Sequence, residues 1–293
     1  MKKLDILFVH PNASKKIYQD LSKDHSAIEP PIWAAMLANH CRSRDFSAQI
    51  LDCEAERFST EESAYTIASI NPMVACFVVY GQQPSASSQN MQGAVDTAKF
   101  LKEINSDIIT LFVGGHVSGL PREVLINHSD CIDYICQNEG VYTISNLLTG
   151  LTGAGFDKRK VKGLGYVEDN IPILNDTEII VPRKMLSKDL PGMAWDLLPN
   201  ISKYRTAGWH SWTNDSEKTP FAALYTSLGC PYRCSFCMIN IINRVDNSPE
   251  IASANSSVFR YWEPEFIINE FDKMAEMGVK NIKIADELFV LNP

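Results

Sequence analysis

The stretch Met73-Val74-Ala75-Cys76-Phe77-Val78-Val79-Tyr80-Gly81 is an apolar run of strand length that stops at a glycine. Runs of this kind are typical of strands that helices cover on both faces, as in parallel sheets. Four similar runs occur at residues 4–9, 48–52, 108–113 and 131–136, and helical patterns lie between them at 31–43 and 92–104. The alternation predicts an α/β domain over residues 1–150, with a doubly wound, five-stranded parallel sheet.

Polar or glycine-bearing loops follow four of these strands. Ligands of doubly wound sheets bind outside the carboxyl ends of the strands, so these loops hold the candidate contacts. The residues concerned are Pro11, Asn12, Tyr80, Gly81, Gln82, Ser85, Gly114, Gly115, His116, Ser118, Glu139 and Gly140. No G-x-G-x-x-G motif opens a helix after the first strand and no G-x-x-x-x-G-K-[ST] motif occurs, which argues against a dinucleotide fingerprint and a phosphate-binding loop.

Three of the eight cysteines are clustered in Gly229-Cys230-Pro231-Tyr232-Arg233-Cys234-Ser235-Phe236-Cys237. A cubane iron–sulfur cluster normally takes four cysteines, so three ligands leave one iron with an open position. The alternative is a structural zinc site, but such sites are closed by a fourth ligand, and no Cys or His follows Cys237. The scattered Cys41, Cys53, Cys76, Cys131 and Cys136 are predicted to be small buried hydrophobic residues.

Composition indicates a soluble, cytoplasmic protein. No apolar run approaches the roughly 20 residues of a membrane span, and the N-terminus enters a strand pattern with no signal-peptide cleavage site. The net charge of -8 argues against a nucleic-acid partner, which would favour a basic face.

Residues 151–218 read as a linker or strap that contains a small hairpin, 163–168 and 171–173. From residue 219 onward, a strand at 221–227 delivers the cysteine loop, an amphipathic helix covers 264–277, and a strand at 280–285 ends at Asp286 and Glu287. Catalytic groups of β/α barrels lie at such strand ends.

The spacing Cys-x3-Cys-x2-Cys, with Phe236 before the last cysteine, resembles the signature of the radical S-adenosylmethionine (SAM) enzymes. The resemblance implies that Cys230, Cys234 and Cys237 hold a [4Fe–4S] cluster whose open iron binds SAM. It also implies SAM contacts from Phe236, Asp286 and Glu287, and cleavage of SAM to a 5′-deoxyadenosyl radical by one electron from a donor such as a flavodoxin or ferredoxin.

The strand-end loops, together with Glu29-Pro30-Pro31-Ile32-Trp33-Ala34-Ala35-Met36-Leu37-Ala38, resemble the Rossmann- or flavodoxin-like cobalamin-binding domain that precedes the barrel in cobalamin-dependent radical SAM proteins. The resemblance implies that the loop residues named above contact cobalamin. Other cobalamin domains carry Asp-x-His-x-x-Gly, whose histidine ligates cobalt, and this hexapeptide does not occur here. Cobalamin is therefore expected to bind without a histidine ligand from that motif.

Only 64 residues run from Cys230 to Pro293, whereas a full β/α barrel takes about 250. Residues 219–293 are therefore expected to form the first strand–helix units of an incomplete radical SAM barrel, either because the chain is a fragment or because a second chain completes it. The resemblance implies methyl transfer to an unactivated carbon of a small-molecule or natural-product substrate. Two alternatives stay open: cyclisation, oxidation or rearrangement by an enzyme of the same type, and a non-catalytic module that binds cobalamin or a partner.

Overall fold

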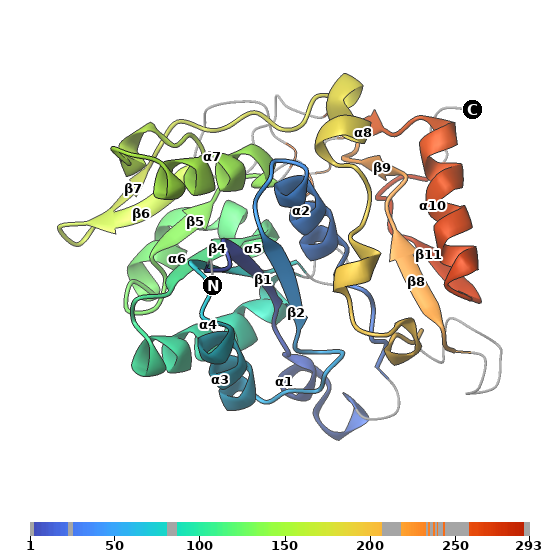
Figure 1. Cartoon of the computed structure of the whole chain (residues 1–293), viewed down its shortest axis with the longest axis horizontal. Coiled ribbons are helices and arrows are strands. Elements are labelled where there is room, and N and C mark those ends of the chain that lie inside the picture. Colours follow the sequence, from blue (N-terminus) through green and yellow to red (C-terminus); the bar gives the residue numbers. More distant parts are fainter. Residues whose placement is uncertain are drawn as a thin grey trace.

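The computed structural model describes residues 3–22, 26–80, 87–206, 218–232, 234, 237, 239, 243 and 258–289. A sheet flanked by helices forms the larger part of the molecule, and β8, β11 and α10 form a smaller part beside it (Figure 1). The strap, drawn in yellow, runs between the two parts. Among the described residues, no helix combines the length and apolar character needed to cross a membrane.

The large sheet contains the five predicted parallel strands in the order β2-β1-β3-β4-β5. Their bounds are β1 Ile6–His10, β2 Ala48–Asp52, β3 Val74–Val78, β4 Ile109–Val113 and β5 Tyr134–Cys136. The strand order reverses between β1 and β3, which is where doubly wound sheets open a crevice for ligands.

The hairpin expected in the linker extends this sheet instead of standing apart from it. β6 (Leu164–Glu168) pairs antiparallel with β5, and β7 (Ile171–Leu174) pairs with β6, so the sheet has seven strands. Gly165 makes the pairing possible, because a Cβ there would lie 2.7 Å from Ile135. The hairpin was predictable from its turn, but its partner strand was not.

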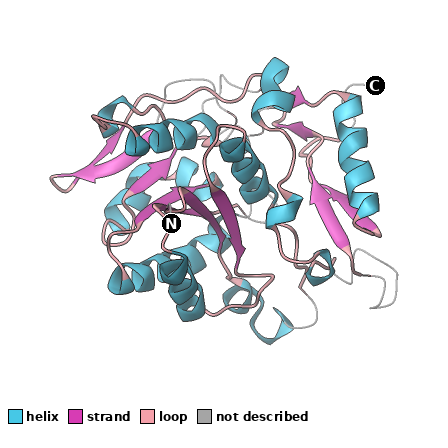
Figure 2. Ribbon diagram, in the orientation of Figure 1, coloured by secondary structure: helices cyan, strands magenta, loops and turns pink. Residues whose placement is uncertain are grey.

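Helices cover both faces of the sheet (Figure 2). Alternate β1 side chains pack against α2 and α7 on one face and against α3 and α4 on the other. The helices are α1 Ser14–Tyr18, α2 Ile32–Arg42, α3 Thr60–Ile70, α4 Ser87–Ile104, α5 Gly115–Gly119, α6 Pro121–Asn127 and α7 Val141–Thr152. The predicted helix at 92–104 begins five residues earlier than expected, because the polar Ser-Ser-Gln-Asn start of α4 carries no apolar signal.

The C-terminal part is a β-α-β unit. β8 (Phe221–Leu224) pairs in parallel with β11 (Asn281–Ile284), and α10 (Pro264–Glu276) connects them. The predicted strand at 221–227 is interrupted at Tyr225 and Thr226, and β9 (Ser227–Leu228) then pairs antiparallel with β10 (Arg260–Tyr261). The cysteine loop starts directly after β9.

The strap holds the two parts together. It contains α8 (Leu186–Asp189) and short 3-10 turns at Arg183–Met185, Trp195–Leu197 and Ile201–Lys203; two more such turns are Gln19–Ser22 and Lys158–Lys160. Asn39 of α2 donates hydrogen bonds to two strap carbonyls, those of Pro191 and Gly192, both at 3.2 Å. One hydrophobic cluster runs from the sheet through α2 and the strap to β8, so the parts share a core.

Candidate functional site

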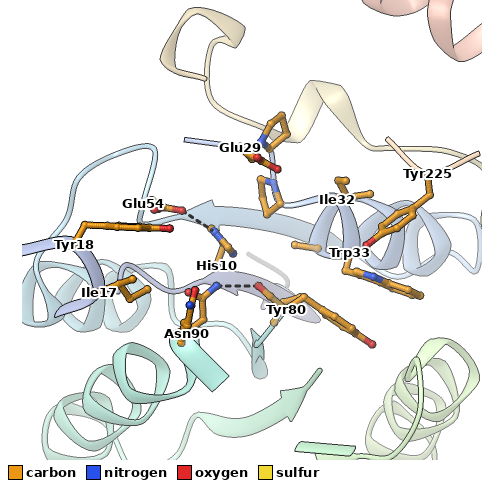
Figure 3. Close-up of a pocket in the computed structure, with 15 residues that line it drawn as sticks. His10, Ile17, Tyr18, Glu29, Ile32, Trp33, Glu54, Tyr80, Asn90 and Tyr225 are labelled. Atoms are coloured by element: carbon orange, nitrogen blue, oxygen red, sulfur yellow. Dashed lines mark hydrogen bonds and ion pairs between the residues drawn. The ribbon is translucent and has the colours of Figure 1, made fainter. Parts of the chain in front are cut away.

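A cavity that is open to solvent lies at the carboxyl edge of the large sheet (Figure 3). Its walls come from the ends of β1 and β3, the segment after β2, the starts of α2 and α4, and the residue after β8. The residues that line it include His10, Glu29, Trp33, Glu54, Tyr80 and Tyr225. The cavity therefore opens where the strand order reverses and where the C-terminal part meets the sheet.

One wall of the cavity is aromatic. Trp33 stacks on Tyr80 with ring centroids 4.8 Å apart, and Tyr225 leans against Trp33 at 6.3 Å. Burial raises the pKa of both Tyr80 and Tyr225 well above the ordinary value, so both phenols are neutral. The buried Tyr80 hydroxyl has no hydrogen-bond partner within the described part of the chain. This wall can cover a large flat ligand.

The opposite wall is polar. His10 Nε2 lies 3.3 Å from Glu54 Oε2, and Asp52 beside them accepts a 2.9 Å hydrogen bond from the Tyr204 hydroxyl. Burial alone would lower the pKa of His10, but the Glu54 hydrogen bond and the Asp52 charge outweigh it and raise that pKa. Burial raises the pKa of Asp52. Because its Nε2 is committed to Glu54, His10 acts here as part of an ion pair.

The sequence pattern identified Tyr80 in this cavity but missed Trp33, Glu54 and Tyr225. Trp33 reads as part of the apolar face of a helix, and Tyr225 as part of a strand. Their shared wall arises only from tertiary contact between segments almost 200 residues apart. Trp33 lies two residues after the Pro30-Pro31 pair, and this aromatic residue at the start of a helix was the available signal.

The first predicted ligand loop is shaped by its own hydrogen bonds. Asn12 Oδ1 accepts from the backbone and hydroxyl of Ser14, at 3.1 and 2.7 Å, and Asn12 Nδ2 donates to the Phe58 carbonyl at 3.0 Å. Pro11 is buried. Asn12 thus fixes the turn after β1, and its side chain is already engaged.

The loop after β4 approaches the chain after β3 very closely. Gly114 has φ +148°, and a Cβ there would lie 1.9 Å from the Val79 carbonyl oxygen, so no other residue fits. Gly115 begins α5. His116 Nδ1 lies 2.8 Å from the Ser88 hydroxyl, and burial lowers the pKa of His116, which favours the neutral ring. The sequence predicted contacts from this loop, and the structure places it beside the loop after β3.

The loop after β5 is tied to its neighbours. Ser118 Oγ donates to the Asn138 carbonyl at 3.1 Å. Gly140 has φ +75° and begins α7, where a Cβ would lie 2.7 Å from Val113. Glu139 is 2% exposed, and its two carboxylate oxygens accept from the Val181 amide and from Arg260.

Four predicted contacts, Gly81, Gln82, Ser85 and Phe236, lie outside the described residues.

The cysteines divide as predicted. The five scattered ones are free and buried, and burial raises the pKa of Cys53 and of Cys131 to about 12. In the loop after β9, Cys230 and Cys237 are half-buried and Cys234 is exposed, so their thiols are accessible. Across the described residues, no three His, Cys, Asp or Glu side chains are gathered around a common point. The loop carries three accessible thiols that this structure does not bring together, so their role as ligands of an iron–sulfur cluster stays a prediction from their spacing.

Asp286 and Glu287 follow β11, near the start of the cysteine loop, and their carboxylates differ in their hydrogen-bond partners. Asp286 accepts from the Thr226 amide at 2.7 Å, from the Thr226 hydroxyl, and from the Ser227 hydroxyl at 2.7 Å. Its carboxylate therefore holds the turn between β8 and β9. Glu287 Oε2 is buried and lacks a partner among the residues described. Burial, with a contribution from the Asp286 charge, raises the pKa of Glu287 to about 7.

Known proteins resemble the chain in sequence. The model of the B12 binding domain family matches residues 25–148. An uncharacterized methyltransferase of Pyrococcus horikoshii is 26% identical over 298 residues, which span 100% of this chain and 55% of that protein. An anaerobic magnesium-protoporphyrin IX monomethyl ester cyclase of Rubrivivax gelatinosus is 25% identical, over 79% of this chain and 38% of the cyclase. The chain thus spans about half the length, or less, of these curated relatives.

The fold also matches a solved structure. The radical SAM methyltransferase TsrM of Kitasatospora setae, solved with cobalamin and a [4Fe–4S] cluster bound, superposes with a TM-score of 0.65 over 99% of this chain and 50% of TsrM, at 17% identity. This likeness confirms the expected fold, a B12-type domain followed by part of a barrel. In sequence and fold the chain is thus similar to cobalamin-binding radical SAM proteins, and its residues 25–148 match the B12 binding domain family.

Proposed function

We propose that this chain is the cobalamin- and cluster-binding portion of an enzyme that methylates an unactivated carbon of a small-molecule substrate. One observation carries the proposal. Tyr225 closes the cavity at the carboxyl edge of the sheet, and the same segment continues through β9 into Cys230. A ligand in that cavity and a cluster on the cysteine loop would therefore be neighbours. In this proposal residues 1–150 bind cobalamin, 151–218 form the strap, and 219–293 begin the barrel.

Cobalamin fits the cavity by the chemistry of its walls. The Trp33–Tyr80–Tyr225 wall suits the apolar flank of a corrin. We propose that the loop around Gly114 contacts the same ligand further along the sheet edge. His10 is held by Glu54, so we propose that cobalt receives no histidine ligand from the loop after β1.

In this proposal the cysteine loop binds the cluster, and the end of β11 binds the ammonium group of SAM. Cys230, Cys234 and Cys237 are the proposed cluster ligands, with Phe236 beside them. Glu287 is the proposed acceptor for the SAM ammonium group, because its Oε2 is free while the Asp286 carboxylate is saturated. When bound, the cluster supplies one electron to SAM and cobalamin carries the methyl group. The chain orients these groups and excludes water from the buried wall.

The cyclase among the relatives supports a second candidate, ring formation on a similar site. An electron donor such as a flavodoxin or ferredoxin, and a further chain or segment that completes the barrel, are proposed partners in either case.

The test uses the chain with hydroxocobalamin, iron, sulfide and SAM carrying a CD3 group, handled anaerobically. Release of 5′-deoxyadenosine with dithionite, lost in Cys234→Ser, is the result expected of a working cluster. Transfer of CD3 to cobalamin, read by mass spectrometry, supports methyl transfer. 5′-Deoxyadenosine without CD3 on cobalamin would favour the cyclase-like reaction. Bound cobalamin with no SAM cleavage would refute catalysis by this chain and leave a binding module.

A further inference from the structure

Arg260 of β10 is the largest fully buried side chain of the described residues, at 1% exposure. Its guanidinium donates to the Val181 carbonyl at 2.7 Å, to Glu139 Oε2 at 2.8 Å and to Asn243 Oδ1 at 2.7 Å. Glu139 Oε1 in turn accepts from the Val181 amide, which closes a ring of three residues. One cation therefore joins four segments that are distant in sequence.

Those segments have different roles. Glu139 lies in the turn after β5 at the carboxyl edge of the large sheet, and Val181 belongs to the strap. Arg260 pairs with Leu228 of β9, directly before the cysteine loop. Gly229, with φ +83°, is enclosed on that side: a Cβ there would lie 2.0 Å from the Val258 carbonyl oxygen and 3.3 Å from Asn243 Cγ. Arg260 thus connects the edge of the sheet to the residue that precedes Cys230.

Stability alone is a weak reason for such a pair. Removing two charges from water costs several kcal/mol per ion, and apolar side chains of similar size often replace a buried ion pair without loss. The Arg260 Nε also has no partner among the described residues, which adds to the cost. What an ion pair provides and an apolar pair does not is a fixed register between the segments it joins.

We propose that Arg260 is a positioning residue that couples occupancy of the cobalamin edge to the order of the cysteine loop. A ligand that holds the Glu139–Gly140 turn also holds Arg260, and through β10 and Asn243 it restrains β9 and Gly229. The Arg260 charge also acts on Glu287, where it opposes a small part of the rise in pKa that burial causes. The inference rests on the proposed cobalamin site.

Hydrogen–deuterium exchange of the full chain tests this coupling, with the amides of 227–230 as the reporter and hydroxocobalamin as the ligand. Cobalamin is expected to slow exchange there about tenfold, within the 5–150-fold range usual for linked sites. In Arg260→Met the cobalamin still binds but this protection is lost. Arg183→Met is the matched control, because Arg183 is exposed, covers the Tyr261 ring on the same strand at 3.6 Å and pairs with the exposed Glu263 at 3.9 Å. It should keep the full effect.

A second measurement does not depend on the single variant folding. Linkage between binding free energies is reciprocal, so if cobalamin increases the affinity of the loop for iron and sulfide by some factor, loading the loop must increase the affinity for cobalamin by that factor in the wild-type chain. Asn243→Leu removes the acceptor of Arg260 on the side of the cysteine loop and leaves the Glu139 turn intact, so this variant should still bind cobalamin but with that factor reduced. Equal protection in Arg260→Met, or a wild-type chain in which cobalamin binds without slowing exchange at 227–230, overturns the inference. Failure of the wild-type chain to bind cobalamin overturns the proposed function as well.

Discussion

Replacement of Glu287 by glutamine should make the protein more stable at alkaline pH and leave its stability at acid pH almost unchanged. Glu287 Oε2 is buried without a partner among the described residues, and burial, assisted by the Asp286 charge, raises the pKa of Glu287 from 4.5 to about 7. The folded protein therefore prefers the protonated acid and is destabilised by the carboxylate.

The sign and size follow from linkage. A raised folded pKa contributes stability that is fully present below pH 4.5 and is lost as pH rises through about 7. Each unit of pKa is worth about 1.4 kcal/mol, so wild type should lose about 2.5 kcal/mol from this group between pH 5 and pH 8. For a chain of 293 residues this corresponds to roughly 4 °C in Tm. Glu287→Gln has no carboxylate and should not show this loss.

The assay is thermal unfolding of both proteins at intervals from pH 5 to pH 8, with Glu103→Gln as the control on the exposed side of α4. The Tm difference between Glu287→Gln and wild type should grow by about 4 °C over that range, whereas the control should follow wild type. An ammonium group beside Glu287 offsets the buried charge, so saturating SAM at pH 8 should raise Tm more in wild type than in Glu287→Gln. Parallel pH curves would refute the buried-acid argument. An equal SAM effect in both proteins would refute the proposed SAM contact alone.

Three other substitutions have defined outcomes. Gly114→Ala places a Cβ 1.9 Å from the Val79 carbonyl oxygen and should cost more than about 3 kcal/mol in urea unfolding; an unchanged midpoint would contradict the close approach. Cys234→Ser should abolish iron loading, read as iron per chain after reconstitution, with little effect on Tm because Cys234 is exposed, whereas Cys76→Ser in the buried β3 should lower Tm and still load iron. Asp286→Asn weakens the hydrogen bonds to Thr226 and Ser227 and should lower the free energy of unfolding by about 2 kcal/mol. It should also lower iron loading, and normal loading would show that the turn held by Asp286 does not position the cysteine loop.

The sheet was predictable because its signal is local. β1 and β3 are buried along their whole length, so each appears in the sequence as an uninterrupted apolar run between polar loops. The hairpin was visible for the same reason, since Asp169 and Asn170, both at positive φ, form its turn. Its pairing with β5 depends on the close contact between Gly165 and Ile135, and no local sequence pattern predicts that contact.

The candidate site was predictable only in part, because long-range contacts decide its composition. The cysteine spacing and the loops at the strand ends are local and were identified. The aromatic wall joins Trp33 to Tyr225, and the ion pair joins Glu139 to Arg260 across 121 residues. A glutamate beside a glycine at a strand end reads equally well as a ligand contact and as half of a buried pair. Only the position of Arg260 shows that its carboxylate is already engaged.

The strap explains why the cavity is formed before any ligand arrives. The strap lies along α2, where Asn39 is bonded to the carbonyls of Pro191 and Gly192, and His40 Nδ1 lies 2.6 Å from the carbonyl of Asp189. These contacts fix the helix that begins with Trp33, while the Tyr204 hydroxyl fixes Asp52 on the polar wall. A cavity whose walls are held by such contacts loses little conformational freedom on binding. Shortening Asn39 to alanine should therefore weaken cobalamin binding although Asn39 does not line the cavity, and an unaltered affinity would mean that the strap only joins the two parts.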